Sequence, residues 1–478
     1  MNYNLLWVDD EVELLKAHII FLEKKGYEVT TVSNGTDAID LCRNRSFDLV
    51  LLDEQMPGLS GLDTLQRIKQ ISPATPIVMV TKSEEENIME QAIGQKIADY
   101  LIKPVNPNQI LLVLKKNIHR REIETEVTQS RYQQQFQQIA MQIMDCRTWQ
   151  EWIAVYKQLV HWELQLSSTD SQMTEMLAMQ KEEANLGFAK FVKKNYLNWV
   201  GGGSSDTPLM SNRIFKEKVF PLLNQKEKVF LVVLDNFRYD QWRVLAQEIG
   251  DQFDLDEDEE EGKNLNEGPL IQTQLERYRR HESFSYNKIN SSSDAEKFMQ
   301  QLNQLGKNDL NVVVFNFIDM LSHARTESKM VRELANNESA YRSITLSWFR
   351  HSVIAEFFRW LAQTDYKVIV TTDHGSIRCT KPVKIVGDRN TNTNLRYKLG
   401  KNLGYDAKDL FVIKDPAQAQ LPSPNLSTSY VFATGDSFFA YPNNYNYYVS
   451  YYKDTFQHGG ISMEEMIIPL ITMTGKKR

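Results

Sequence analysis

Aspartate and histidine residues recur after apolar, β-branched runs in the second half of this 478-residue sequence. Three such runs, Val229–Leu234, Val312–Phe317 and Lys367–Thr371, are typical of buried strands. Because the carboxyl ends of parallel strands meet at one edge of a sheet, the side chains that follow them can share one crevice. Carboxylates together with imidazoles are the ligand mixture expected for zinc or a similar divalent ion. The residues concerned are Asp235, Asp319, His323, Asp373, His374 and, later in the chain, His458.

The spacing of these residues also suits metal binding. Asp319 and His323 are four residues apart, so on a helix they lie on one face and can reach one ion. Asp373 and His374 are adjacent, and both can act as ligands in an extended turn. An aspartate at a strand end is often only a helix cap, so it is the grouping that predicts a site. Asp235 and His458 add to these two pairs, so the six residues form two sets of three ligands. Two metal ions held in this way could bridge a phosphoryl group.

A second acidic group lies near the N-terminus. Asp9 and Asp10 directly follow the first predicted strand, and Asp53 follows the third. Three carboxylates in one place repel one another, and magnesium, which prefers oxygen ligands, is the cation expected to hold them ionised. One carboxylate could then attack a phosphoryl group whose charge the metal neutralises. Thr81 and Lys103 follow the fourth and fifth strands and would supply a hydroxyl and a cation to the same group.

These residues resemble, in type and spacing, those of two-component response-regulator receiver domains, over the whole of residues 1–120. The resemblance implies that Asp53 is phosphorylated by a sensor histidine kinase, while the acidic pair before it helps to hold magnesium. It also implies that Thr81 and Tyr100 rearrange when the aspartate is phosphorylated. The alternative is that the acidic pair only caps a helix and that the tyrosine is only a half-buried strand residue.

Alternating strand and helix patterns must position these N-terminal residues. Each of five short apolar runs is followed by an amphipathic segment. Five such units predict a doubly wound parallel sheet with one crevice at the strand ends. The Lys103-Pro104 bond, at a tight turn, is a candidate cis peptide. The strands are predicted at Leu5–Val8, Glu28–Val32, Leu49–Leu52, Ile77–Val80 and Asp99–Ile102, and the helices at Glu11–Lys25, Thr36–Asn44, Gly61–Ile71, Glu84–Ile93 and Pro107–Arg121.

The middle of the chain shows helical periodicity and no strand pattern. Aromatic and aliphatic residues recur at helical spacing, for example Tyr132, Phe136 and Ile139. They predict a connecting helical bundle whose stripes form its core rather than a binding site. A Gly- and Ser-rich stretch, Gly201–Ser205, then marks a flexible boundary before a second, larger α/β domain. The predicted domains are residues 1–120, 121–203 and 204–478.

Composition narrows the classes of function. The formal net charge of −7 gives no general attraction to nucleic acid and disfavours a DNA-binding output domain. Three scattered cysteines form neither a disulfide framework nor a metal-binding knuckle, and they fit a reducing compartment. The sequence shows neither a signal-peptide pattern nor the run of about 20 apolar residues that a membrane helix needs. We therefore expect a cytoplasmic protein without membrane insertion.

The order of the acidic and histidine residues after the later strands resembles that of the alkaline phosphatase superfamily, and more narrowly its PglZ branch, over residues 206–478. The resemblance implies a phosphodiesterase or phosphatase with two zinc ions. It also implies that Arg238, near a helix N-terminus, contacts phosphate oxygens, whereas a surface salt bridge is its alternative role. The implied ligands are Asp319, His323 and His458 for one ion, and Asp235, Asp373 and His374, with the nucleophile, for the other.

The nucleophile cannot be identified in the sequence. The family places a Thr or Ser in a loop after the second strand, but here Phe253 leads straight into the acidic run Asp254–Gly262, with no second strand and no such loop. We interpret this run as a solvated loop. A second interpretation is that a segment of the natural chain is missing at this point. Thr273, the first threonine afterwards, has no strand–turn context, so we assign it no role.

A receiver domain, a helical connector and a PglZ domain in this order resemble the PorX-type response regulators, over essentially the full chain. The resemblance implies a regulator of type IX secretion that dimerises when a sensor kinase phosphorylates it and that acts on oligonucleotides or cyclic nucleotides. The alternative is a metal-stabilised, catalytically silent docking module that binds a transcription factor, such as a sigma factor, or a secretion component. Loss of metal-dependent hydrolysis in Asp373→Ala or His323→Ala would separate the two functions.

Overall fold

The chain forms two compact units, Met1–Arg131 and Tyr132–Arg478. The predicted helix Glu84–Ile93, the boundary residues 202–205 and Thr273 lie outside the described residues. A computed structural model describes residues 3–82, 97–167, 171–201, 206–261, 282–327, 331, 333, 335, 337–387, 391–405, 410–425 and 427–476.

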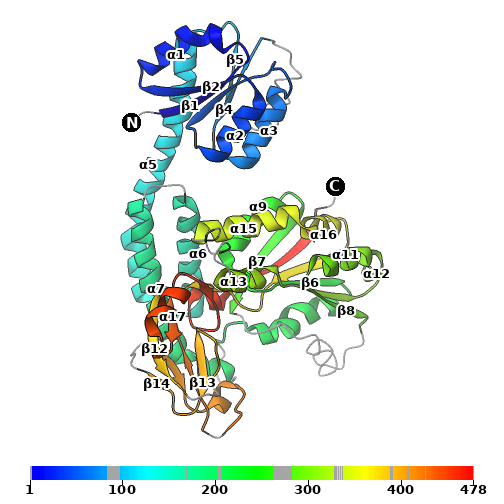
Figure 1. The fold of residues 1–478 in the computed structure, drawn as a ribbon. Coiled ribbons are helices and arrows are strands. Elements are labelled where there is room, and N and C mark those ends of the chain that lie inside the picture. Colours follow the sequence, from blue (N-terminus) through cyan, green and yellow to red (C-terminus); the bar gives the residue numbers. More distant parts are fainter. Residues whose placement is uncertain are drawn as a thin grey trace. The chain divides into compact units, whose positions relative to one another are not determined.

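The first unit is the predicted doubly wound α/β domain. Its five parallel strands lie in the order β2-β1-β3-β4-β5. Parallel sheets need cover on both faces, and here α1 and α5 pack on one face and α2 and α3 on the other (Figure 1). The elements are β1 Tyr3–Val8, η1 Val12–Leu15, α1 Lys16–Glu23, β2 Tyr27–Val32, α2 Gly35–Asn44, β3 Leu49–Asp53, α3 Gly61–Ile71, β4 Ile77–Thr81, β5 Asp99–Ile102 and α5 Pro107–Asp145.

Alternate residues of the first strand belong to the two cores of this unit. In β1, Leu5 and Trp7 pack with α1 and α5, whereas Leu6 and Val8 pack with α2 and α3. All four side chains are fully buried, and burying each of the aliphatic ones contributes about 1.5–3 kcal/mol. This alternation holds the end of the strand, and therefore Asp9, at the rim of the sheet.

Three details of this unit bear on the sequence predictions. The predicted cis bond Lys103–Pro104 is present. The helix predicted at Glu11–Lys25 starts as a 3-10 turn before α1 begins at Lys16. The helix predicted to end at Arg121 continues to Asp145, across the boundary between the two units, because helical periodicity does not stop at the predicted domain border.

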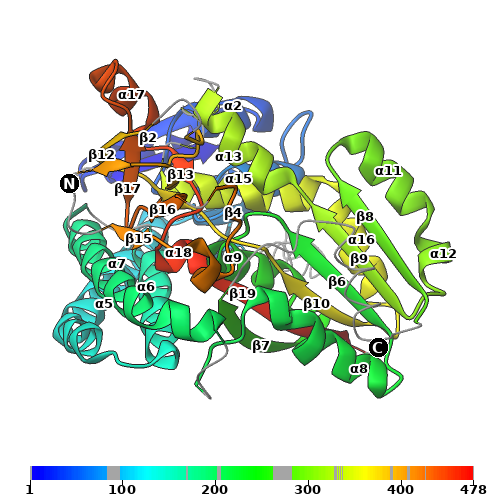
Figure 2. The same ribbon diagram turned by 90° about the horizontal axis from the view of Figure 1, so that it is seen from below.

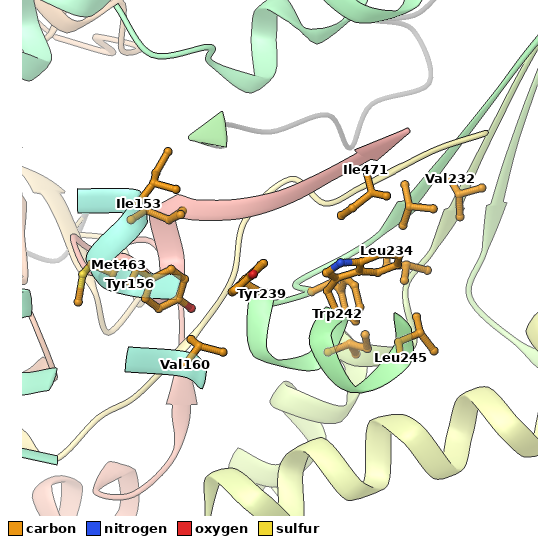
Figure 3. Close-up of a cluster of buried hydrophobic side chains, with 14 of the residues drawn as sticks. Ile153, Tyr156, Val160, Val232, Leu234, Tyr239, Trp242, Leu245, Met463 and Ile471 are labelled. Carbon is orange, nitrogen blue, oxygen red and sulfur yellow. The ribbon is translucent and has the colours of Figure 1, made fainter. Parts of the chain in front are cut away.

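In the second unit the connector and the output domain share one hydrophobic core. Helices α6 (Trp149–Leu166) and α7 (Ser171–Val200) bury the predicted aromatic stripes against each other and against the output domain. Figure 3 shows Ile153 and Tyr156 of α6 in one cluster with Met463 and with Tyr239 of α9. The rings of Tyr156 and Tyr239 lie 6.0 Å apart. The connector helices are therefore packed against the output domain.

A six-stranded sheet forms the centre of the output domain, in the order β7-β19-β10-β6-β9-β8. Figure 2 shows β8, β9, β6 and β10 side by side; these four are parallel, and β19 runs antiparallel to both β10 and β7. The central strand β6 is buried along its whole length, which explains its wholly apolar sequence. The strands are β6 Val229–Leu234, β7 Phe253–Glu261, β8 Phe284–Ile289, β9 Leu310–Phe315, β10 Lys367–Thr371 and β19 Ile467–Gly475.

Helices and three smaller sheets complete this domain. The small sheets are β11-β18, β14-β12-β17 and β13-β16-β15. Within the described parts of the chain, no helix combines the length and the apolar character needed to cross a bilayer. The remaining elements are η2 Ser211–Arg213, η3 Phe215–Val219, α8 Phe220–Asn224, α9 Tyr239–Ile249, α11 Ser292–Gln300, α12 Leu302–Leu305, α13 Phe317–Glu327, α15 Glu338–His351, α16 Val353–Leu361, β11 Ile377–Arg378, β12 Lys381–Val386, β13 Tyr397–Gly400, β14 Gly404–Tyr405, β15 Phe411–Ile413, η4 Pro416–Ala419, β16 Ser429–Phe432, β17 Ser437–Ala440, α17 Tyr445–Tyr452, β18 Phe456–Gln457 and α18 Met463–Met466.

The acidic run after Phe253 is a strand, so the prediction of a solvated loop without a second strand is wrong. The nine residues of β7 pair in antiparallel register with the nine residues of β19. This pairing outweighs the low strand propensity of Asp and Glu. Within the described residues, β7 is an edge strand of the sheet. The strand predicted at Val312–Phe317 also differs: β9 ends at Phe315, and α13 already begins at Phe317.

Candidate functional site

The receiver-like unit brings its acidic residues together at the carboxyl ends of β1 and β3. Asp9, Asp10 and Asp53 offer carboxylate oxygens that lie within 4.8 Å of one another. Asp9 and Asp53 are buried, whereas Asp10 is exposed. Lys103 Nζ lies 2.7 Å from Asp9 Oδ2 and 2.8 Å from Asp53 Oδ2. The chain therefore places one cation of its own inside the predicted magnesium site.

Burial and charge act against each other at Asp53. Burial raises the pKa of its carboxyl, Lys103 opposes this effect, and Asp9 adds to it. Burial alone would lower the pKa of Lys103, but the two carboxylates outweigh it and the pKa is raised. A divalent cation would reinforce Lys103 and favour the ionised carboxylate. Of the two predicted switch residues, Thr81 is buried at the end of β4, and Tyr100 is 41% exposed on β5.

In the output domain, three adjacent strands carry predicted ligands at their carboxyl ends. Asp235 follows β6, Asp319 lies in the first turn of α13 after β9, and Asp373 and His374 follow β10. Asp235, Asp373 and His374 offer ligand atoms within 4.8 Å of one another, and so do Asp319, His374 and His458. His374 thus belongs to both groups, whereas the sequence analysis placed it in one.

The two histidines at the centre of the cluster are stacked. The ring centroids of His374 and His458 lie 4.1 Å apart, with 9° between the planes. Burial, followed by the neighbouring His374 and His323, lowers the pKa of His458 well below its usual range. Burial alone would also lower the pKa of His374, but Asp373 and two other aspartates outweigh it and the pKa is raised. The neutral His458 ring is the form that binds a metal ion.

His323 lies at the margin of the cluster. Its Nε2 is 3.4 Å from Asp319 Oδ2, four residues earlier on α13, and its ring is 5.9 Å from that of His458. However, its side chain is 63% exposed, and it belongs to neither group of mutually close ligand atoms. The structure therefore brings the other five predicted ligands together and leaves His323 beside them.

Asn236 is a site residue that the sequence analysis missed. It is fully buried, with a φ of 63°, and its backbone N–H donates to Asp373 Oδ1 at 3.3 Å. Its side-chain Nδ2 donates to Asp319 Oδ1, also at 3.3 Å. Asn236 Oδ1 is buried with no hydrogen-bond partner among the described residues. The available signals were its position directly after Asp235 and the tolerance of asparagine for left-handed backbone.

The donor chemistry of this cluster fits a divalent cation. Carboxylate oxygens this close together repel one another unless positive charge lies among them. The cluster combines these oxygens with imidazole nitrogens, and a buried amide oxygen without a hydrogen-bond partner in the described part of the chain lies next to them. Oxygen and nitrogen donors in this proportion suit zinc. The residues present therefore fit the kind of ion that the resemblance implies.

Arg238 pairs with carboxylates rather than lying open to a phosphate group. Its Nε and Nη2 donate to Asp240 at 2.9 and 2.6 Å, and Nη2 also donates to Glu338 at 2.5 Å. The guanidinium carbon lies 5.5 Å from the Tyr341 ring and 5.1 Å from the Phe456 ring. The side chain is 2% exposed. Arg238 therefore forms salt bridges, as the alternative interpretation stated, but they are buried and not at the surface. We treat Arg238 as an ion-pairing residue.

Three protein-family models match the chain, in the same order as the predicted domains. Residues 5–115 match the response regulator receiver domain, residues 122–200 match the PorX response regulator linker domain, and residues 214–259 and 250–473 match the BREX system PglZ alkaline phosphatase-like domain. Fold and site therefore define a response regulator with an alkaline phosphatase-like output domain. Because the PglZ match covers more than half of the chain, the chain belongs to the PglZ family.

Individual relatives match the receiver domain. The transcriptional regulatory protein ResD of Bacillus subtilis (strain 168) is 34% identical over 116 residues, which are 24% of this chain and 48% of ResD. The alkaline phosphatase synthesis transcriptional regulatory protein PhoP of the same organism is 32% identical over 125 residues, 26% of this chain and 51% of PhoP. The chain thus spans about half the length of these curated relatives. A CheY-like receiver domain structure from Methanospirillum hungatei JF-1 is 27% identical, with a TM-score of 0.25, and covers 26% of this chain and 99% of its own.

Proposed function

We propose that this chain is a response regulator, phosphorylated on Asp53 by a sensor histidine kinase, whose output domain is a zinc-dependent phosphodiesterase or phosphatase. The observation that carries the proposal is the cluster of aspartates and histidines at the carboxyl ends of three adjacent strands. The match to the PorX linker domain supports a cytoplasmic regulator of type IX secretion that dimerises on phosphorylation. Oligonucleotides or cyclic nucleotides are the proposed substrates.

In the receiver domain, Asp53 would take the phosphoryl group. Asp9 and Asp10 would hold magnesium beside it, because their oxygens lie within 4.8 Å of the acceptor carboxylate. Lys103, 2.8 Å from Asp53 Oδ2, would pair with the phosphoryl oxygens. Thr81 would supply its hydroxyl to the same oxygens and rearrange together with Tyr100 on β5.

In the output domain, the clustered side chains would hold two zinc ions. Zinc bound there would withdraw charge from a phosphoryl group and favour nucleophilic attack on it. Asn236 donates to Asp373 and to Asp319 and so keeps both carboxylates oriented. The proposed ligands are Asp235, Asp373 and His374 for one ion, and Asp319, His458 and the marginal His323 for the other.

No residue is assigned as the nucleophile. The family places this residue in a loop after the second strand. Strand β7 is the second strand of this domain along the chain, and the residues that follow it, 262–281, which include Thr273, lie outside the described part of the chain. The alternative function is a docking module that keeps its metal ions for stability and binds a transcription factor or a secretion component.

A pocket whose lining includes Met320, the residue after Asp319, supports a nucleotide substrate. It has a volume of about 450 Å³ and lies at the carboxyl ends of β8 and β9. Phe317 and Trp348 line it as a stacked pair, with centroids 4.6 Å apart. Asn316 also lines it, and its Oδ1 is buried with no hydrogen-bond partner in the segments described. Aromatic rings bind bases by stacking, and amide groups bind base edges, so the pocket suits a base next to the phosphoryl site.

The proposed activity is tested by hydrolysis of a chromogenic phosphodiester and a chromogenic phosphomonoester by the full chain. Each is measured with zinc, after chelation, and with and without acetyl phosphate as phosphodonor, together with a count of bound metal. Zinc-dependent turnover of the diester would support the enzyme and require a nucleophile outside the described residues. Bound zinc without turnover of either compound would favour the docking module.

The base pocket is tested separately with Trp348→Ala. Stacking of one base on an aromatic ring contributes about 1–3 kcal/mol, so KM for a dinucleotide should rise about 5- to 150-fold. Turnover of the small chromogenic diester, which has no base to place there, serves as the control and should not change. Equal effects on both substrates would mean that the residue supports the fold and not base binding.

A further inference from the structure

The one-turn helix α18 lies between the two loops that carry the histidine ligands. The backbone oxygen of Glu465 accepts a hydrogen bond from the N–H of Gly375, which follows His374, at 3.1 Å. Its side-chain Oε1 accepts a second one from the N–H of Gly460, two residues after His458, at 2.9 Å. A single residue of α18 therefore contacts both ligand loops.

These loops have little room to shift relative to α18. A Cβ on Gly375 would lie 2.0 Å from the carbonyl oxygen of Glu464, and a Cβ on Gly460 would lie 2.5 Å from Arg396 Nη2. Arg396 is fully buried and holds Glu465 through two hydrogen bonds, at 3.0 and 2.6 Å. The position of α18 thus sets the position of both loops.

Helix α18 is in turn anchored by a residue of the connector. Asn185 Oδ1, on α7, accepts a hydrogen bond from the backbone N–H of Met463 at 2.8 Å, and Asn185 Nδ2 donates to Glu464 Oε2 at 2.9 Å. The first N–H groups of a helix have no partner within it, so the amide satisfies one of them. Asn185 is 4% exposed and Glu464 is 5% exposed, so water does not readily replace either bond.

A buried group of charges extends this anchor to α6. Lys181, one turn before Asn185 on α7, lies 3.4 Å from Glu464 Oε1 and 2.7 Å from Glu163 Oε2. Arg342 of α15 pairs with the same Glu163 at 2.6 Å. Alternating charges therefore hold α6, α7 and α18 together, and removal of one would leave an unpaired buried charge.

From these contacts we infer that Asn185 is a positioning residue for the metal centre. It fixes α18, and α18 fixes the loops of His374 and His458. The inference rests on the proposed zinc ligands, but it adds a residue of the connector to the output site. A movement of α7 would then reach the ligand loops through two hydrogen-bonded steps.

The test is the zinc affinity of the full chain with Asn185→Ala, measured by competition with a chromogenic chelator and so without any turnover. Residues that hold metal ligands in place typically change affinity by about 10- to 100-fold, and we expect a loss of about tenfold. Gln180→Ala is the matched control. Gln180 is a buried amide on the same helix, but its hydrogen bonds to Tyr132 Oη and to the Phe136 carbonyl, at 2.9 and 2.8 Å, stay within the connector.

A rescue variant separates positioning from general destabilisation. Asn185→Asp combined with Glu464→Gln reverses donor and acceptor between the two side chains and keeps both hydrogen bonds, so zinc affinity should recover. Equal losses in Asn185→Ala and Gln180→Ala, or full affinity in Asn185→Ala, would overturn the positioning role. If the unchanged chain bound no zinc, the proposed metal centre would fail and the inference with it.

Discussion

The receiver site and the output site are both clusters of aspartates at the carboxyl ends of parallel strands, but they balance charge differently. In the receiver, Lys103 lies within 2.8 Å of both buried carboxylates, so the chain supplies one cation itself. In the output domain, the aspartates contact His374 and His458, whose rings are stacked 4.1 Å apart. Two rings this close are not both in the positively charged imidazolium form, because like charges repel. The output site therefore depends more on an external cation.

A third acidic cluster shows what separates a metal site from an ionic network. Glu163, Asp240 and Glu338 offer oxygens within 4.8 Å of one another, as metal ligands would. However, Arg238 lies 2.6 Å from Asp240, and Arg342 lies 2.6 Å from Glu163 and 3.0 Å from Asp240. Together with Lys181, 2.7 Å from Glu163, these two arginines neutralise the three carboxylates. Acidic side chains alone thus do not identify a metal site; the cations that the chain places among them decide.

Among variants that distinguish the two sites, Asp53→Asn is expected to have the largest effect, on phosphorylation of the receiver. An amide does not attack a phosphoryl group, so the variant should lose all phosphorylation by acetyl phosphate, measured by intact mass. Zinc affinity of the output domain should not change, which serves as the control. A variant that is still phosphorylated would place the acceptor at another residue.

Asp373→Ala is expected to have the next largest effect, on the output site alone. It removes a proposed ligand and the acceptor for the N–H groups of Asn236 and His374. Zinc affinity should fall by more than about 100-fold, since loss of a ligand exceeds the loss of a supporting residue. Chelator competition measures it, and urea unfolding checks the fold. Full zinc stoichiometry in this variant would contradict the assignment.

Arg342→Met tests the cluster that carries its own cations. Removing one partner of a buried ion pair destabilises a protein by about 3 kcal/mol, and Arg342 is 6% exposed. Arg350→Met is the matched control on the same helix: Arg350 pairs with Glu248 but is 47% exposed, so the loss should be under about 1 kcal/mol. Urea unfolding at pH 7 compares them. Equal losses would contradict a special role of the buried pair.

The effect of Arg342→Met should also depend on pH. Burial alone would raise the pKa of Asp240 and of Glu163, but Arg342 and the other cations outweigh it and both pKa values are lowered. Groups with lowered pKa stabilise the fold above their ordinary values, here 3.8 and 4.5, and this contribution is lost as pH falls through the folded values. The difference between variant and unchanged chain should therefore stay constant from pH 7 down to these ordinary values of 3.8 and 4.5, and shrink only below them, in the same unfolding experiment.

The sequence predicted the receiver closely because its signals are local. The predicted site residues lie at or just after the ends of short strands, except Tyr100, which lies within β5. Alternation within the strands, as in β1, sets which residues face the two cores. The central strands of the output domain were predictable for the same reason: β6 and β10 have the predicted bounds. The residues that follow them, Asp235 and Asp373, accordingly meet at one edge.

Contacts between distant parts of the chain explain what the sequence did not reveal. The acidic residues of β7 form a strand because β19, near the C-terminus, pairs with them. The contact of Asn185 with Met463 joins two helices that no pattern relates. Arg238 was placed near phosphate because its position after Asp235 suggested a helix N-terminus, but its partners Asp240 and Glu338 come from packing.

His323→Ala is expected to have the smallest effect, and it tests whether spacing or geometry identifies ligands better. The i, i+4 spacing to Asp319 predicts a ligand, but 63% of the side chain is exposed and its Nε2 contacts only one of the clustered aspartates, at 3.4 Å. We expect zinc affinity to fall by about 3- to 10-fold, at or below the range for residues that support a ligand. His458→Ala, measured by the same chelator competition, is the comparison and should lose more than about 100-fold. If the two variants lost equally, spacing along the helix would be the better guide, and His323 would have to turn inward when zinc binds.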